Sequence, residues 1–406
     1  MKNLKKKGFT IVELVIVIAV IAVLAAVLIP TFVNLTRKAN QSADIQATRQ
    51  MNVVLASDKY ATIEEAVAAL AEAGYNALDT LTPVSTGYSF WWVEEYNSIV
   101  LLNEKAEVVF ASNNDAKENF AAAKEAGKAF NLKRGLPEVE AGESESVVDA
   151  LRNGQSVVLS QSLEISEKAL IKTGEDVVID LNGHTLTTTA TNSGTSIRHE
   201  TIEVSKGATL VIENGIFEGR SVMNYGTLTI KSGTTIKALD YSGGGCIRNK
   251  AGGKVVIEGG TFEAVNHMGW NEVASYYGGA AVVHNDGGEV IINGGTFVSA
   301  TDAYLITNNA GTMTINGGTF KAHRGILSCN AGTVTINNNP SMSIEVVNNA
   351  DCEYAGKAYI FYAENGNIIV NGGTFTGGLN TYCVKGEGTG SITLKDGTKL
   401  TAGQQQ

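Results

Sequence analysis

The sequence predicts a multidomain protein in which a long N-terminal helix carries a small α+β head and an all-β solenoid follows. Three observations support this fold class. The run from Ile11 to Ile29 is almost continuously apolar, and apolar residues keep a helical spacing after it. A stretch rich in aromatic and β-branched residues comes next. The second half repeats a short unit with Gly and Asn turns, which is typical of a solenoid.

Composition limits the function classes. The chain has 406 residues, 45 of them glycine, and a net charge of -10, so it lacks the basic character of a nucleic-acid-binding protein. The cysteines have no C-x-x-C spacing, and therefore no zinc site and no cofactor are predicted. They either form one or two disulfides outside the cell or fill the core as small apolar residues. These cysteines are Cys246, Cys329, Cys352 and Cys383.

The apolar run predicts a transmembrane segment over 11–29. A helix rises ~1.5 Å per residue, so this run can cross the ~30 Å hydrocarbon core of a bilayer. Lysines precede it at Lys2 and over 5–7, which places the N-terminus in the cytoplasm and most of the chain outside the cell. Glu13 does not fit this environment, because a carboxylate in a membrane segment is costly and usually functional.

The N-terminal residues resemble the start of a type IV prepilin or pseudopilin. A basic leader ends at Gly8, Phe9 follows, Glu13 is the fifth residue of the mature chain, and Pro30 falls where pilin helices commonly bend. The resemblance implies that a prepilin peptidase cuts between Gly8 and Phe9 and methylates the new amine of Phe9. It also implies that Glu13 pairs with the N-terminal amine of a neighbouring subunit, because an unpaired buried charge is destabilising. The alternative is a simple signal anchor that carries an acid.

A small head is expected after the long helix. A second helix begins at Thr62, where a capping residue is followed by Glu65. The aromatic-rich segments around 87–103 and 105–110 predict an antiparallel sheet, in which either Trp91 or Trp92 packs on the long helix. A helical stretch is expected near Asn114–Asn131. The predicted boundaries are 1–8 for the leader, 9–55 for the helix, 56–132 for the head, 133–145 for a linker and 146–406 for the solenoid.

The repeats in the second half predict a parallel β-helix. Each unit of roughly 18–24 residues alternates apolar and polar positions, turns at Asn-Gly and resumes at Thr-Phe, which favours one solenoid coil per unit. The residues 146–153 predict a short helix that caps the first coil. The clearest copies of the unit end at Phe217, Phe262, Phe297, Phe320 and Phe375.

An asparagine recurs at the end of the strand before each turn. Stacked coils would place these amides above one another, where each can both donate and accept a hydrogen bond. The pattern resembles the asparagine ladder of pectate-lyase-like right-handed β-helices, a likeness of fold that does not by itself assign activity. The expected ladder consists of Asn224, Asn249, Asn285, Asn308 and Asn330.

A candidate ligand patch follows several of the repeats. Polar residues three to five positions after the repeat phenylalanine are expected at one edge of neighbouring coils, and an aromatic insertion lies nearby. No paired acids recur and no calcium-loop motif is present in the sequence, so no catalytic residue and no metal are predicted. The patch residues are His267, Trp270, Tyr276, Tyr277, Asp302, His323 and Arg324.

Two functions fit these observations. The first is a minor pilin or pseudopilin that joins a homo- or hetero-filament and displays its β-helix for adhesion to an extracellular glycan or host surface. It would reside in the cytoplasmic membrane before assembly and then at the cell surface or in the pilus. The second is a surface-anchored polysaccharide lyase or hydrolase. The lack of recurring paired acids favours the first.

Overall fold

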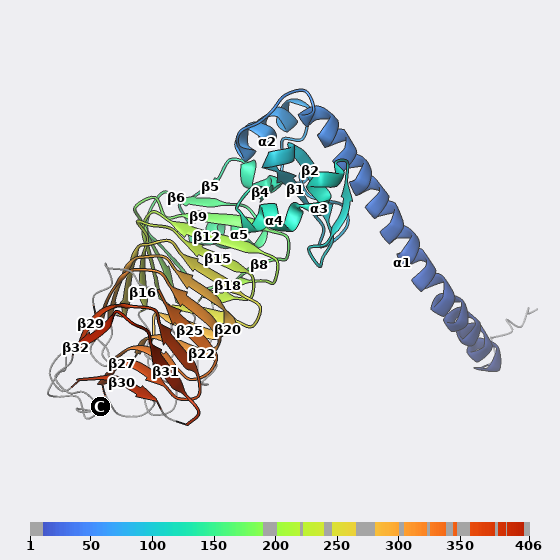
Figure 1. Ribbon diagram of the computed structural model, residues 1–406. Coiled ribbons are helices and arrows are strands. Elements are labelled where there is room, and N and C mark those ends of the chain that lie inside the picture. Colours follow the sequence, from blue (N-terminus) through green and yellow to red (C-terminus); the bar gives the residue numbers. More distant parts are fainter. Residues whose placement is uncertain are drawn as a thin grey trace, which may run out of the picture.

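Three parts follow one another in the computed structural model of the chain (Figure 1). A long helix runs into a small head, and a solenoid leaves the head in a direction different from that of the helix. The structure describes residues 11–189, 201–219, 222–238, 246–264, 281–299, 304–322, 325–337, 344–346, 358–377, 381–386 and 388–401.

The long helix α1 extends over Ile11–Leu55. Its final turns are buried against the head, with Met51 and Leu55 fully enclosed, whereas the turns before residue 32 project beyond the head. Pro30 lies inside α1. A proline in a helix interior has no amide hydrogen to donate, so α1 lacks one backbone hydrogen bond at this position. The predicted long helix is confirmed.

The head is built around the four-stranded antiparallel sheet β3-β2-β1-β4. Its helix α2 (Ile63–Glu72) begins as expected, since the Thr62 side chain accepts a hydrogen bond from the Glu65 amide. Two short helices, α3 (Asn114–Glu118) and α4 (Phe120–Glu125), lie between β3 and β4. The strands are β1 (Ser89–Val93), β2 (Ser98–Leu102), β3 (Val108–Ala111) and β4 (Ala129–Asn131).

The two adjacent tryptophans face opposite sides of this sheet. Trp92 packs in the cluster that contains Met51 and Leu55 of α1, whereas Trp91 packs with Phe120 of α4. Successive side chains on a strand alternate between the two faces, which explains the division. The last three residues of the segment 114–131, which was expected to be helical, form the strand β4. This strand pairs with Trp91, Trp92 and Val93 of β1. That part of the helix prediction was wrong, because two short helices and a turn occupy the segment before β4.

The segment 133–145 is folded and connects the head to the first coil. It includes most of the 3-10 turn η2 (Leu132–Gly135), the strand β5 (Val139–Ala141), and the start of the helix α5 (Ser144–Arg152). β5 pairs in parallel with β6 (Val157–Leu159) and so already belongs to the solenoid. The apolar side of α5 is buried in the solenoid core, which confirms the predicted helix over the first coil.

The solenoid is a parallel β-helix with three faces. Each coil contributes one strand or strand segment to each face, and every strand pairs with its counterpart in the next coil. Face 1 comprises β8 (Ala169–Ile171), β11 (Ile202–Val204), β14 (Val222–Asn224), β17 (Ile247–Lys250), the first parts of β20 (Val283–Ile292) and β22 (Tyr304–Ile315), β24 (Gly325–Cys329), β27 (Ala358–Ala363) and β30 (Thr381–Gly386).

The other two faces follow the same rule. Face 2 comprises β5, β6, β9 (Asp176–Asp180), β12 (Thr209–Glu213), β15 (Thr227–Ile230), β18 (Lys254–Ile257), the second parts of β20 and β22, β25 (Thr333–Ile336), β28 (Asn367–Val370) and β31 (Ser391–Leu394). Face 3 comprises β7 (Leu163–Ile165), β10 (Thr185–Thr188), β13 (Ile216–Gly219), β16 (Thr235–Ala238), β19 (Thr261–Ala264), β21 (Thr296–Ser299), β23 (Thr319–Ala322), β26 (Ile344–Val346), β29 (Gly373–Gly377) and β32 (Thr398–Thr401).

The repeat phenylalanines stack inside face 3. Phe262, Phe297 and Phe320 occupy the same register on consecutive coils. Their rings are nearly parallel, with centroids 4.4 Å apart for the first pair and 4.7 Å apart for the second. The repeat unit is therefore one coil, as the sequence predicts.

The asparagine ladder runs inside the end of face 1. Asn224 donates to Asn249 at 2.8 Å, Asn249 donates to Asn285 at 3.0 Å, and Asn285 donates to Asn308 at 2.7 Å. The next position in register is Cys329, whose Sγ lies 3.6 Å from Asn308 Nδ2.

The expected fifth member, Asn330, is not in this ladder. It lies one residue further along, in an outer column, where it donates to Asn309 at 2.8 Å. A shift of one residue along a strand turns a side chain to the opposite face, so the prediction for Asn330 was wrong. A further ladder, missed by the sequence reasoning, joins the turns between faces 2 and 3 through Asn293, Asn316, Asn337 and Asn371.

Candidate assembly surface and head–solenoid junction

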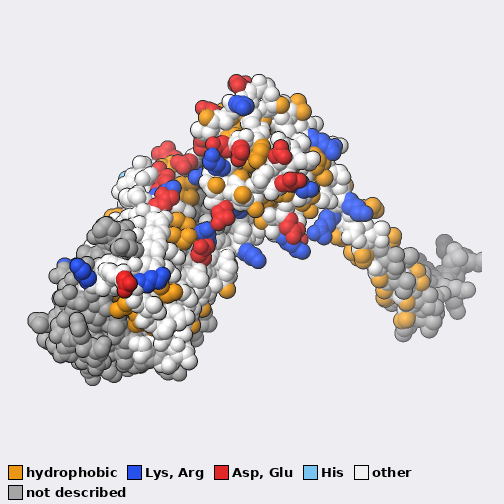
Figure 2. All heavy atoms as spheres, viewed as in Figure 1, with side chains coloured by type: hydrophobic (Ala, Val, Ile, Leu, Met, Phe, Trp, Pro, Cys, Tyr) orange, Lys and Arg blue, Asp and Glu red, His pale blue; other side chains and the backbone are white. Residues whose placement is uncertain are grey.

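The projecting part of α1 carries a large apolar surface. Figure 2 shows hydrophobic side chains along this helix outside the head. Leu28, Ile29 and Phe32 are 61%, 62% and 71% exposed, and soluble monomers rarely leave such contiguous apolar surface in water. Among the described residues, no helix is long and apolar enough to cross a membrane, and the span expected over 11–29 stays a prediction from the sequence.

The residues of the processing motif lie at or before the start of α1. Gly8 and Phe9 lie outside the described residues. Glu13 belongs to the first turn of α1, but its side chain is not among those described. The roles expected for these residues therefore stay predictions.

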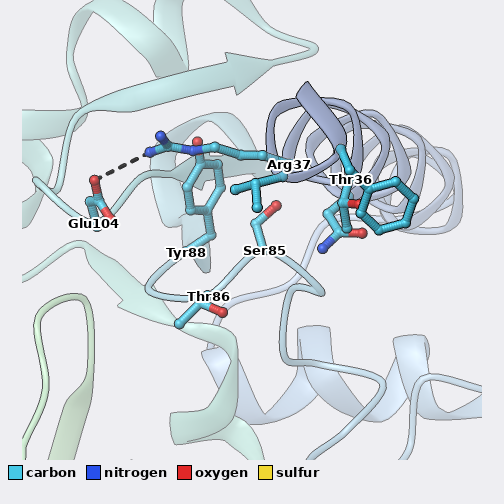
Figure 3. A pocket seen from close by; sticks show the side chains of 9 residues that line it. Thr36, Arg37, Ser85, Thr86, Tyr88 and Glu104 are labelled. Atoms are coloured by element: carbon cyan, nitrogen blue, oxygen red, sulfur yellow. Dashed lines mark hydrogen bonds and ion pairs between the residues drawn. The ribbon is translucent and has the colours of Figure 1, made fainter. Parts of the chain in front are cut away.

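A groove lies where α1 leaves the head (Figure 3). It has a volume of about 630 Å³. One wall is a stretch of α1, and the other is the loop before β1 together with the turn between β2 and β3. The lining residues are Phe32, Val33, Thr36, Arg37, Asn40, Ser85, Thr86, Tyr88 and Glu104.

Polar contacts hold the two walls of the groove together. The Asp44 carboxylate of α1 accepts hydrogen bonds from the backbone amides of Val84 and Ser85 at 2.7 and 3.0 Å. Arg37 reaches across to Glu104 at 3.4 Å, as Figure 3 shows. The Asp44 contacts are buried and fix the loop, whereas the Arg37–Glu104 pair is exposed and contributes little to stability.

The head packs against the turns between faces 1 and 2 of the first coils. The Gly174 carbonyl accepts hydrogen bonds from Trp91 Nε1 at 3.2 Å and from Asn131 Nδ2 at 2.5 Å. In the next coil the Gly207 carbonyl accepts from Lys124 Nζ at 3.0 Å, and this ammonium lies 4.3 Å from the Trp91 ring centroid. Burial lowers the pKa of Lys124. These contacts attach the side of the solenoid to the head.

Two ion pairs strengthen this junction. Lys133 Nζ lies 3.5 Å from the Glu175 carboxylate, with both side chains 9% exposed. Burial lowers the pKa of Lys133 and raises the pKa of Glu175. The charge of the partner acts in the opposite direction on each pKa but is outweighed by burial. Arg134 contacts both oxygens of Asp176, at 3.3 and 3.2 Å. Removing one member of such a buried pair leaves an uncompensated charge, so both partners are needed together.

Replacing Gly174 by alanine is expected to loosen the junction. Gly174 has a φ of +83°, and a Cβ there would lie 2.6 Å from Ser89 Oγ. Gly183 is a matched control, because its φ is +80° and a Cβ would meet nothing within 4 Å. We expect Gly174→Ala to cost about 1–2 kcal/mol more than Gly183→Ala, measured as faster hydrogen exchange in 129–131 and 172–176. Equal exchange in both variants would contradict this contact.

The solenoid carries a polar cluster where face 1 meets face 2. Asp286 contacts Lys250 at 2.8 Å, Arg248 at 3.2 Å and Asn309 at 2.8 Å. Burial raises the pKa of Asp286, but the hydrogen bonds from Lys250 and Asn309 outweigh burial, so its pKa lies below the usual value. These contacts join three consecutive coils, which is the pattern of a structural cluster, although the buried Arg248 Nε has no hydrogen-bond partner among the described residues.

The predicted ligand patch lies outside the described residues. Its residues belong to segments that connect a strand of face 3 to the next strand of face 1. Within the described ranges, no group of three or more His, Cys, Asp or Glu side chains is arranged to hold a metal ion. The residues outside the description are His267, Trp270, Tyr276, Tyr277, Asp302, His323 and Arg324.

The described cysteines are free thiols. Cys246 and Cys329 are both buried and unpaired. Burial raises the pKa of Cys246 to about 12, so its thiol stays protonated at neutral pH. Cys352 and the side chain of Cys383 are not described.

Comparison with known proteins agrees with the N-terminal architecture. The chain begins with a long helix that exposes apolar side chains and runs into a small α+β head. Residues 3–29 match the family model of the prokaryotic N-terminal methylation motif, which confirms the resemblance to prepilins. The chain is similar to the type IV narrow pilus major component of Thermus thermophilus, with 51% identity over 45 residues.

That similarity is confined to a short stretch. It covers 11% of this chain and 38% of the relative, so the chain spans well under half of the length of that relative. No solved structure matches the chain. The likeness of the solenoid to pectate-lyase-like β-helices therefore stays a prediction.

Proposed function

We propose that this protein is a minor pilin or pseudopilin that assembles through α1 into a surface filament and displays its β-helix to an extracellular ligand. The observation that carries the proposal is the match of residues 3–29 to the methylation motif at the start of a helix whose apolar side chains are exposed. Such a surface needs a nonpolar environment, first the cytoplasmic membrane and then the neighbouring subunits of a filament.

Processing and assembly follow from the N-terminal motif. A prepilin peptidase cuts between Gly8 and Phe9 and methylates the new amine of Phe9. The Glu13 carboxylate then pairs with the positively charged amine of a neighbouring subunit. Charge neutralisation inside an apolar bundle makes the correct axial position of the incoming subunit the favourable one.

In this proposal, the β-helix is the domain that contacts the extracellular ligand. The junction at Trp91 and Gly174, with the Lys133–Glu175 and Arg134–Asp176 pairs, holds it in one orientation relative to the head. A domain this large beside the head favours a subunit present in few copies. We propose a non-enzymatic display function, with an extracellular glycan or host-surface molecule as the ligand.

The mature N-terminus tests the proposal directly. Mass spectrometry of the protein recovered from cells is expected to show a chain that begins at Phe9 with one added methyl group. The same measurement in cells lacking the prepilin peptidase should show residues 1–8 still attached. If the protein from cells that contain the peptidase still carries residues 1–8, the proposal is wrong.

A further inference from the structure

We propose that the part of face 2 far from the head binds an uncharged, extended polysaccharide whose chain runs along the solenoid axis. This inference rests on the proposed display function, and it names the surface and the chemical class of the ligand. The surface, which we call the neutral field, consists of the outward residues of face 2 from the second part of β22 to β31. Its members are Thr312, Thr314, Asn316, Thr333, Thr335, Asn337, Asn367, Ile369, Asn371, Ser391 and Thr393.

Alternation along each strand turns these side chains outward. In β22, Met313 and Ile315 are buried in the solenoid core, whereas Thr312 and Thr314 alternate with them and reach solvent. The strands β25 and β28 repeat the same alternation. The neutral field is therefore accessible to a ligand.

The neutral field differs in charge from the rest of face 2. On the coils from β9 to β20, charged residues occur in both outer columns of the face. From β22 to β28, the corresponding positions hold only Thr, Asn and Ile. A charged polymer would therefore find no counter-charge among the residues of the field. The charged residues nearer the head are Asp176, Asp180, Glu213, Lys231, Lys254, Glu258 and Glu289.

The neutral field is regular in two directions. Its strands pair in register without a shift, so neighbouring coils repeat at ~4.7–4.9 Å. Alternate residues within one strand lie ~6.6 Å apart, which is twice the rise per residue. Successive coils hardly rotate, since the rings of Phe297 and Phe320 stack with an interplanar angle of 9°. A straight polymer laid along the axis would thus contact several coils in the same way.

The side chains of the field are held in place before a ligand arrives. Asn337 donates to Asn316 at 2.7 Å, and Asn371 donates to Asn337 at 2.8 Å, which orients the amides of one column. Threonine and isoleucine are β-branched and therefore restricted at χ1. Binding consequently costs little side-chain entropy.

The chemistry of the field matches a neutral sugar polymer. Threonine hydroxyls and asparagine amides both donate and accept hydrogen bonds, as sugar hydroxyls do. The threonine methyl groups and Ile369 offer apolar contacts to the C–H groups of sugar rings. In an extended β-linked chain, one pyranose ring advances by nearly the interval between two coils, so each coil would meet one ring.

The composition of the field favours a polymer over a protein partner. The field contains no aromatic and no arginine side chain, which are the usual anchors of protein interfaces. Each coil would contribute a weak contact, and repetition of that contact along one polymer raises the overall affinity. The ligand is therefore a long chain.

Co-sedimentation with insoluble polysaccharides tests the ligand class. The full chain in detergent is mixed with microcrystalline cellulose, with chitin or with insoluble polygalacturonate. We expect retention by at least one of the two neutral polymers and none by the acidic polymer. A soluble disaccharide of the retaining polymer should not displace the chain, because it meets too few coils. Retention by neither neutral polymer, or equal retention by polygalacturonate, would contradict the proposal.

A paired substitution tests the surface. Thr312→Lys/Thr333→Glu places opposite charges on two register partners, as Lys254 and Glu289 already do in the same column nearer the head, 3.5 Å apart. The fold should accept this pair, and hydrogen exchange in β22 and β25 should be unchanged. We expect retention to fall about tenfold or more, because a neutral ligand would desolvate both charges.

Thr296→Lys/Thr319→Glu is the matched control. Thr296 and Thr319 are exposed register partners on face 3, so the same two charges appear on neighbouring coils but outside the neutral field. Retention of this variant should equal that of the unaltered chain. If the face 3 pair abolishes retention and the face 2 pair does not, the assignment to face 2 is wrong.

The outcomes separate this inference from the proposed assembly. If the chain begins at methylated Phe9 and enters filaments but no neutral polysaccharide retains it, the neutral field is not the ligand surface and the assembly function stands. If a neutral polymer retains the chain through Thr312 and Thr333 while residues 1–8 stay attached in peptidase-containing cells, the assembly function fails and the neutral field stands.

Discussion

Glu13→Ala is expected to leave the chain in the membrane but to stop its entry into filaments. The apolar run around this position is unchanged, so anchoring should persist. The amine of the neighbouring subunit would lose its counter-charge in an apolar bundle, and breaking a buried pair in this way costs about 3–5 kcal/mol. Because ~1.4 kcal/mol corresponds to a tenfold change, incorporation should fall by about a hundredfold or more. The measurement is the ratio of the chain in sheared filaments to that in membranes.

Two further variants test whether the charge of Glu13 causes this loss of assembly. Glu13→Gln keeps the size and hydrogen-bonding capacity of the side chain but removes its charge, and it should fail to assemble as well. Glu118→Ala removes an exposed carboxylate from α3 and should assemble normally. Normal incorporation of Glu13→Gln would show that the charge is not what matters at this position.

Phe297→Ala is expected to destabilise the middle of the solenoid by about 3–5 kcal/mol. Phe297 is fully buried, and its ring stacks between those of Phe262 and Phe320. The substitution would leave a cavity and remove both stacking contacts at once. Coils in a solenoid stabilise their nearest neighbours, so hydrogen exchange should accelerate in β19, β21 and β23 before it does in the head.

Phe32→Ala is the control for this substitution. It removes the same side chain from a position that is 71% exposed, so the solenoid amides should exchange as in the unaltered chain. Phe297→Leu should lie between the two, because leucine fills part of the cavity. Unaltered protection of β21 in Phe297→Ala would mean that the phenylalanine stack does not support the coil.

The sequence was sufficient for features that depend on local periodicity. The repeat phenylalanines could be aligned because each follows the same Gly-rich turn, and the structure places them in one register on face 3. The opposite orientations of Trp91 and Trp92 followed from strand alternation alone. The extent of α1 followed from apolar spacing that continues past Pro30.

Other features depend on contacts that sequence periodicity does not report. The shared turn Asn-Ala-Gly-Thr at 309–312 and 330–333 aligns Asn330 with Asn309, a signal that the sequence reasoning missed, and the strand register pairs Cys329 with Asn308 at the inner position. β4 is three residues long, too short for a recognisable alternation, and is defined by its pairing with β1. The groove combines residues 32–40 of α1 with Ser85, Tyr88 and Glu104, which are distant in sequence.

The segment between head and β-helix illustrates the same limit. Its composition predicts a linker over 133–145, yet Arg134 contacts Asp176 and β5 joins face 2. Charged and small residues are common both in flexible connections and in tightly packed polar junctions, so composition does not distinguish them.

The lateral attachment of the head to the first coils has a mechanical consequence. A ligand held near β31 or β32 would pull on the far end of a stiff lever whose pivot is the pair of turns at Gly174 and Gly207. The resulting torque would concentrate on a few hydrogen bonds and two ion pairs, while the stacked coils shared the load among many strands. Under tension, the contacts at Gly174 and Gly207 would therefore break before the coils of the β-helix separate.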